Sequence, residues 1–169
     1  MSSAEASQQP EPRRTAPRRP PRRTAPRRPP RRHVIQTWAW VYALLFFLVV
    51  AVGYVPAFND ANGNLFGLFS LQLVDDALHL GSGIWAALAA WRSAYASTLY
   101  FRLFGTIYFL DGAVGLIFGR AYLDGGLFID GPAPLDLMTK VATNLPHLVI
   151  GGTAVLLGFV VARRHVDLG

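Results

Sequence analysis

Four long apolar stretches follow one another along the chain, separated by shorter segments that are richer in polar residues, glycine and proline. A helix needs about 20 predominantly apolar residues to cross the hydrocarbon core of a bilayer, which is about 30 Å thick. The stretches of this length lie at residues 35–54, 70–91, 99–119 and 141–162. Between residues 41 and 52 the first stretch has no charged or amide side chain, whereas a helix of a soluble bundle needs a polar face. The pattern predicts four transmembrane helices.

Polar residues interrupt three of these stretches. The second stretch is the least apolar, because its first half holds Gln72, Asp75, Asp76 and His79. The third stretch carries Asp111 near its middle, and the fourth carries His147. A titratable side chain is costly in hydrocarbon, so its presence there indicates a functional site.

One spacing occurs twice: Asp76 precedes His79 by three residues, and Asn144 precedes His147 by three residues. Each pair lies near the start of the second helix of a predicted hairpin. Residues three and four apart are neighbours on a helix, so Asp75 can also reach His79. We therefore expect an all-α fold, a four-transmembrane-helix bundle made of two repeated helical hairpins. A pseudo-two-fold axis along the membrane normal would relate the hairpins and bring both pairs into one polar centre.

Depth follows from a helix rise of about 1.5 Å per residue. Counted from the inner ends of their helices, both pairs lie in the outer half of the membrane, and Asp111 lies near the midplane, within about a turn of His79. This depth makes His79 the expected partner of Asp111. Pro146 either leaves the carbonyl of Ala142 without its donor or marks the first turn of the fourth helix.

Small residues near the two histidines predict close helix packing. The glycines expected at such contacts are Gly81, Gly83, Gly115, Gly119, Gly151 and Gly152. The histidines themselves have three interpretations. They could fasten helices to one another by hydrogen bonds, bind a proton or small ligand, or supply the two axial ligands of a haem.

Arginine and lysine placement predicts the orientation in the membrane. Of the 16 basic residues, only Arg120 and Lys140 fall in the first and third connections, and the other fourteen flank the opposite ends of the predicted helices. We therefore expect a multi-pass protein of the cell membrane with both termini in the cytoplasm.

An N-terminal tail, residues 1–33, precedes the transmembrane domain, residues 34–169. Residues 13–21 read RRTAPRRPP, and residues 22–30 repeat that sequence. Dense proline and ten like charges between Arg13 and Arg32 predict a disordered segment. Such a tail is expected to contact anionic lipid headgroups. Because no aromatic residue is interleaved to stack on bases, no specific nucleic-acid binding is expected.

Several kinds of chemistry are not favoured by the sequence. The chain has no cysteine, which excludes disulfides and thiolate sites. It also lacks G-x-S-x-G, H-E-x-x-H and a phosphate-binding loop, so a hydrolytic enzyme is the least favoured class. We predict no catalytic residue, no metal site and no cofactor, apart from the haem alternative above.

Three segments carry a resemblance to a known family: residues 65–91, 100–119 and 144–152. They contain an FGLF turn at residues 66–69, the D-x-x-H-x-x-x-G pattern of residues 76–83, an aromatic and basic pattern at residues 101–108, and the N-x-x-H pair. In these features the chain resembles domain-of-unknown-function family 4383, over about residues 40–161. The resemblance implies a small bacterial membrane protein with four helices, and it implies no activity.

The sequence thus predicts an integral membrane protein with a polar centre in the outer half of its bundle. The residues of this centre are Asp75, Asp76, His79, Asp111, Asn144 and His147. The biochemical role stays open among three classes: a small-solute or proton-handling carrier, a haem-binding redox protein, and a structural or partner-binding subunit. Four helices rarely enclose a wide path, so transport would require a homo-oligomer.

Overall fold

The computed structural model describes residues 34–67, 69–70 and 73–165. The predicted tail, including the arginines expected to contact lipid headgroups, lies outside the described residues. The helices and strands, in chain order, are α1 (Val34–Gly53), η1 (Pro56–Phe58), β1 (Asn64–Leu65), β2 (Phe69–Ser70), α2 (Leu73–Arg92), α3 (Ala94–Phe118), α4 (Gly126–Asp130), α5 (Leu137–Leu156), the π-helical turn η2 (Leu157–Val161) and α6 (Ala162–His165).

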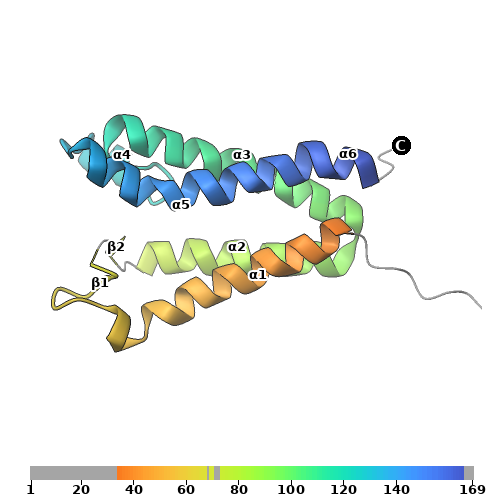
Figure 1. The fold of residues 1–169 in the computed structure, drawn as a ribbon, viewed down its shortest axis with the longest axis horizontal. Helices are drawn as coiled ribbons and strands as arrows, with labels where there is room; N and C mark the ends of the chain where they lie inside the picture. Colours follow the sequence, from red (N-terminus) through yellow and green to blue (C-terminus); the bar gives the residue numbers. More distant parts are fainter. Residues whose placement is uncertain (1–33, 68, 71–72, 166–169) are drawn as a thin grey trace, which may run out of the picture. The chain divides into compact units, whose positions relative to one another are not determined.

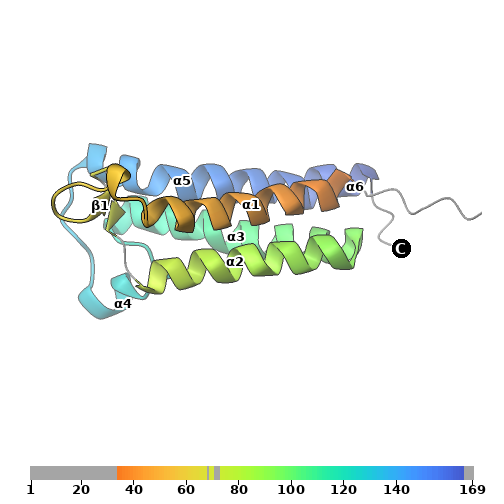
Figure 2. The ribbon, with the colours of Figure 1, turned by 90° about the horizontal axis from the view of Figure 1, so that it is seen from below.

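Long helices make up most of the described residues, and the predicted all-α fold is confirmed. Helix α1 packs along α2, and α3 packs along α5 (Figure 1). The view from below shows the axes of α1, α2, α3 and α5 lying side by side along the bundle, with successive helices running in opposite directions (Figure 2). Among the described residues, β structure is limited to the short antiparallel pair β1 and β2 and a bridge beside it.

In the part of the chain that the structure describes, three segments are long and apolar enough to cross a membrane: Val34–Gly53, Ala94–Phe118 and Leu137–Val161. Helix α2 also has 20 residues but is not among them. The aspartates and histidine of its first two turns lower its hydropathy. Of the four predicted spans, length and composition therefore bear out three.

Three helix starts differ from the predicted boundaries by three residues or more. Helix α2 begins at Leu73 rather than residue 70, and Ser70 instead belongs to strand β2. Helix α3 begins at Ala94 rather than residue 99, because the hydroxyl of Ser93 caps it by accepting a hydrogen bond from the Ala96 N–H at 3.0 Å. Helix α5 begins at Leu137 rather than residue 141, because the Asp136 carboxylate accepts from the Thr139 N–H at 3.1 Å. Pro146 consequently lies inside α5 and not in its first turn.

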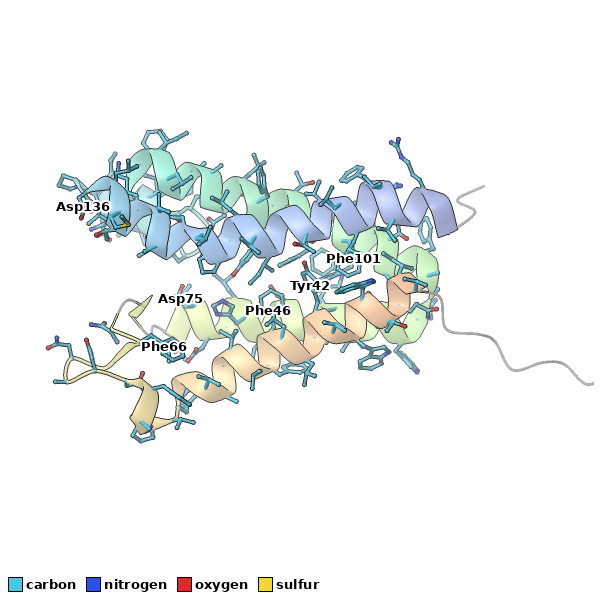
Figure 3. All side chains as sticks on the ribbon, in the orientation of Figure 1. Tyr42, Phe46, Phe66, Asp75, Phe101 and Asp136 are labelled. Atoms are coloured by element: carbon cyan, nitrogen blue, oxygen red, sulfur yellow. The ribbon has the colours of Figure 1, made fainter. Side chains whose placement is uncertain are left out.

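The core between the two helix pairs is aromatic. The Tyr42 ring meets the Phe101 ring edge to face, with centroids 5.0 Å apart, and Phe46 meets Phe104 in the same way at 5.3 Å. Such pairs stabilise by about 0.5–1.5 kcal/mol beyond their buried area. Figure 3 shows Tyr42, Phe46 and Phe101 in the space between α1/α2 and α3/α5. These rings fill the middle of the bundle, and the buried polar side chains lie toward its two ends, Ser97 and Thr98 at one and Asp111 and Asn144 at the other.

Helices α3 and α5 approach closely through glycines. A Cβ on Gly105 would lie 2.7 Å from the Val155 nitrogen, and one on Gly158 would lie 2.8 Å from the Arg102 nitrogen. A Cβ on Gly112 would lie 2.9 Å from the Cβ of His147. A larger residue at any of these positions would push the two backbones apart. This contact therefore sets how far His147 stands from α3.

Candidate functional site

A cavity of about 70 Å³ lies at the end of the bundle where α2 and α5 begin and α3 approaches its end. Its lining residues are Asp75, Leu78, His79, Tyr108, Asp111, Ala121, Leu123, Asp124 and His147. Four of the six residues predicted for the polar centre are thus brought together: Asp75, His79, Asp111 and His147. Figure 3 labels Asp75 near the start of α2. A space of this size holds a few water molecules or a small ion.

Asp111 is the most deeply buried acid of the site, with 1% of its surface exposed. Its Oδ1 accepts hydrogen bonds from the backbone N–H groups of Tyr122 at 2.8 Å and Leu123 at 2.9 Å. Its Oδ2 lies 3.8 Å from Nε2 of His147. The expected pairing of Asp111 with His79 is therefore replaced by contacts with His147 and with a loop. Depth along the helix axis alone did not specify which neighbouring helix faces Asp111.

The loop reaches Asp111 because the chain reverses at the end of α3. Gly119 caps the helix in the left-handed conformation, with φ of 75°, and its N–H donates to the Gly115 carbonyl at 2.8 Å. The following residues fold back, and the Tyr122 hydroxyl donates to the Ile107 carbonyl at 2.8 Å. Two effects raise the pKa of Tyr122: its partial burial, which is the larger, and the nearby charge of Asp111. The connection between the third and fourth predicted spans therefore forms one wall of the cavity.

Tyr108 links the two histidines. Its hydroxyl lies 3.4 Å from Nε2 of His79, and its ring centroid lies 4.5 Å from that of His147. Phe46 covers the other side of His79, with ring centroids 5.8 Å apart. We did not predict Tyr108 as a site residue. Its position three residues before Asp111, on the same helix face, was the signal that could have identified it.

The first residue of each predicted pair points away from the cavity. Asp76 accepts a hydrogen bond from the Tyr54 hydroxyl at 2.7 Å, and this bond raises the pKa of Tyr54. Asn144 is buried, donates to the Lys140 carbonyl at 2.9 Å and packs on Gly115 of α3. Both residues contact the neighbouring helix or its end.

The predicted packing glycines divide into three groups. Gly83, Gly115 and Gly151 lie at tight contacts with a neighbouring helix. A Cβ on Gly81 would meet no atom within 4 Å, and one on Gly152 would make only ordinary contacts with the Phe109 ring. Gly119 is the cap described above and lies beyond the end of α3. Close packing therefore concentrates on one side of each helix.

The geometry bears on the haem alternative. Because the side chain of Tyr108 contacts both histidines, a haem held by both rings would have to displace it. Within the described residues, no group of three His, Asp or Glu side chains is arranged to hold a metal ion. The arrangement instead provides acid and base groups in contact: His79, Tyr108, His147 and Asp111.

Comparison with protein-family models, curated proteins and solved structures gives no match. The family resemblance of the sequence therefore stays a prediction, and function must be argued from the site.

Proposed function

We propose that the chain is a multi-pass membrane protein that binds and releases protons at the cavity end of its bundle. In this proposal α2 is the fourth span, since it matches α1 in length and packs along it. Both termini lie in the cytoplasm of the cell, and the cavity opens on the outer side. The distribution of basic residues along the sequence supports this orientation, since only Arg120 and Lys140 of the 16 fall in the first and third connections.

The hairpins α1/α2 and α3/α5 are the proposed repeat units. Each places a histidine of the same local pattern beside Tyr108. The family resemblance, the lipid contacts of Arg13–Arg32 and assembly as a homo-oligomer belong to the same proposal. An oligomer would provide the enclosed path that four helices alone rarely form.

The contact series His79, Tyr108, His147 and Asp111 is the observation that carries the proton-handling function. These groups come from three different helices. The Tyr108 hydroxyl lies 3.4 Å from Nε2 of His79, and Oδ2 of Asp111 lies 3.8 Å from Nε2 of His147. Imidazole groups exchange protons near neutral pH. The phenol of Tyr108 can donate to or accept from His79, and its ring packs on the ring of His147. Asp75 and Asp124 line the same cavity.

The test follows protonation of the histidines directly. The full chain is labelled with ¹⁵N-histidine, purified in detergent and titrated by NMR, with the four histidines assigned by single substitutions. We expect the ring signals of His79 and His147 to respond to pH together, and Asp111→Asn to change the His147 titration. The signals of His33 and His165, outside the predicted spans, serve as internal controls.

Two results would refute the proton-handling function. One is that neither His79 nor His147 takes up a proton between about pH 4 and 9, the range that spans ordinary carboxyl and imidazole titration. The other is that Asp111→Asn leaves the His147 titration unchanged. Either result would favour histidines that only fasten helices together.

A further inference from the structure

A second cavity adjoins the first. It has a volume of about 160 Å³ and lies between α2 and α3. Its lining residues are Leu78, Ser82, Trp85, Phe104, Ile107, Tyr108 and Leu123. Leu78, Tyr108 and Leu123 line both cavities, so these three side chains form the boundary between them.

The two cavities differ in chemistry. The first is lined by three carboxylates, two imidazoles and a phenol, and none of its described lining residues is lysine or arginine. The second is lined by hydrocarbon and aromatic rings, with hydroxyl groups only from Ser82 and Tyr108 among its described lining residues. Its volume is close to that of an apolar cavity of about 150 Å³ known to hold one benzene molecule.

We propose that the two cavities together bind an amphiphilic monocation, a primary ammonium group carrying a hydrocarbon tail of about six carbons or one aromatic ring. The ammonium group occupies the acidic cavity, and the tail occupies the apolar one. This inference rests on the proposed proton site and names the class of solute that shares it.

Charge decides the nature of the head group. Carboxylates that face one small cavity repel one another unless a proton or a cation neutralises them. An ammonium group donates three hydrogen bonds, which the carboxylate oxygens of this cavity can accept. A carboxylate or phosphate head group would add to the repulsion. Proton and ammonium therefore compete for Asp75, Asp111 and Asp124.

Position decides the nature of the tail. The apolar cavity is bordered by Trp85 and Ile107, whose side chains are partly exposed on the side of the bundle, at 39% and 42% of their surface. In a membrane this side faces hydrocarbon. An alkyl tail reaches the cavity from the lipid, while the head group stays at the polar end.

The test measures binding of hexylammonium to the full chain in detergent by isothermal titration calorimetry. Hexanol and hexanoate have the same tail with a neutral and an anionic head group, and empty micelles report partitioning. We expect hexylammonium to bind at least tenfold more tightly than either. Shortening the tail from six to five carbons should weaken binding about fourfold, as expected for one buried methylene.

Four variants sharpen the test. Asp111→Asn should weaken hexylammonium binding at least tenfold, and Asp75→Asn, at a half-buried position, provides a second acid variant if Asp111→Asn folds poorly. Asp136→Asn is the matched control: it removes a carboxylate outside the cavity, and asparagine also caps helices. Ser82→Leu fills the apolar cavity, so it should abolish the dependence on tail length while methylammonium still binds.

The inference is overturned if hexanol binds as tightly as hexylammonium. It is also overturned if Asp111→Asn and Asp75→Asn both bind hexylammonium as tightly as Asp136→Asn does. Absence of hexylammonium binding also overturns it. If His147 protonation still depends on Asp111 in that case, the proton-handling function survives alone. If that dependence is absent as well, both proposals fail.

Discussion

The pattern D/N-x-x-H-x-x-x-G occurs twice, at residues 76–83 of α2 and residues 144–151 of α5. The two segments occupy similar positions in the bundle but are held there by different contacts. In both, the histidine contacts Tyr108 and the glycine packs against the neighbouring helix. A Cβ on Gly83 would meet mainly the Phe47 ring, 3.0 Å away, whereas one on Gly151 would meet the backbone of Phe109. The α5 segment is therefore held by main chain and the α2 segment by side chains.

This difference indicates which half of the site is rigid. Side chains can change rotamer at small cost, but two backbones in contact can separate only if the helices move. His147 is thus fixed relative to Asp111, and His79 has more freedom relative to Tyr108. A ligand that enters the cavity meets one preformed wall and one adjustable wall.

Replacement of Asp111 tests the rigid half most severely. Asp111→Leu removes the acceptor of two backbone N–H groups, and each buried unsatisfied donor costs about 1–3 kcal/mol. We expect the free energy of unfolding in detergent to fall by about 2–6 kcal/mol. The control Asp76→Leu loses one exposed hydrogen bond and should cost less than about 1 kcal/mol. Equal stability of the two variants would contradict the comparison.

The two glycines test the contrast between main-chain and side-chain packing. Gly151→Ala should destabilise the protein by about 1–3 kcal/mol, the usual cost of overpacking. Gly83→Ala should be close to neutral, since Phe47 can move and alanine favours a helix by up to about 1 kcal/mol over glycine. Thermal unfolding followed by circular dichroism in detergent measures both. A larger loss for Gly83→Ala would reverse our assignment of the rigid half.

A double-mutant cycle tests whether the two segments act as one site. Because both histidines contact Tyr108, His79→Ala and His147→Ala should be non-additive by at least about 0.5 kcal/mol in unfolding free energy. The cycle of His79→Ala with Asp136→Asn should be additive within that value. Additivity in both cycles would mean that the histidines are independent fasteners.

The smallest expected effect concerns the exposed end of the α2 segment. The hydrogen bond from Tyr54 to Asp76 raises the pKa of Tyr54, so the bond stabilises the fold below about pH 10, the unfolded value. That contribution is lost as pH rises through the folded pKa. Ultraviolet difference titration of Asp76→Asn, with Tyr54→Phe to assign the signal, should show Tyr54 ionising at lower pH than in the unsubstituted chain. An unchanged midpoint would exclude the bond.

Much of this arrangement was accessible from the sequence. Apolar length predicted the helices, and the position of polar residues within them predicted that Asp75, His79, Asp111 and His147 would meet. Which of them pair could not be predicted, because helix rise gives depth but not the rotation of one helix against the next. The wall formed by residues 121–124 was also inaccessible, since it depends on where Gly119 reverses the chain.

The packing of α3 on α5 was predicted only in part. Gly115 and Gly151 were expected at helix contacts, but Gly105, Gly112 and Gly158 were not. Their spacing of seven residues, 105 to 112 and 151 to 158, places them two turns apart on one helix face and was a usable signal. It would have identified the side of α5 that meets α3.

A single residue, Ser93, connects α2 and α3. Because of this tight corner, the contact between His79 and Tyr108 depends on how many residues separate each of them from Ser93. His79 lies fourteen residues before Ser93 and Tyr108 fifteen residues after it. At about 1.5 Å per residue, the two arms are about 21 and 22 Å long, so equal lengths measured from one corner bring the side chains together. One residue inserted into either arm would turn the remainder by about 100° and separate them. Length can vary in the turn at residues 59–64, while the chain from His79 to Tyr108 must keep its residue count.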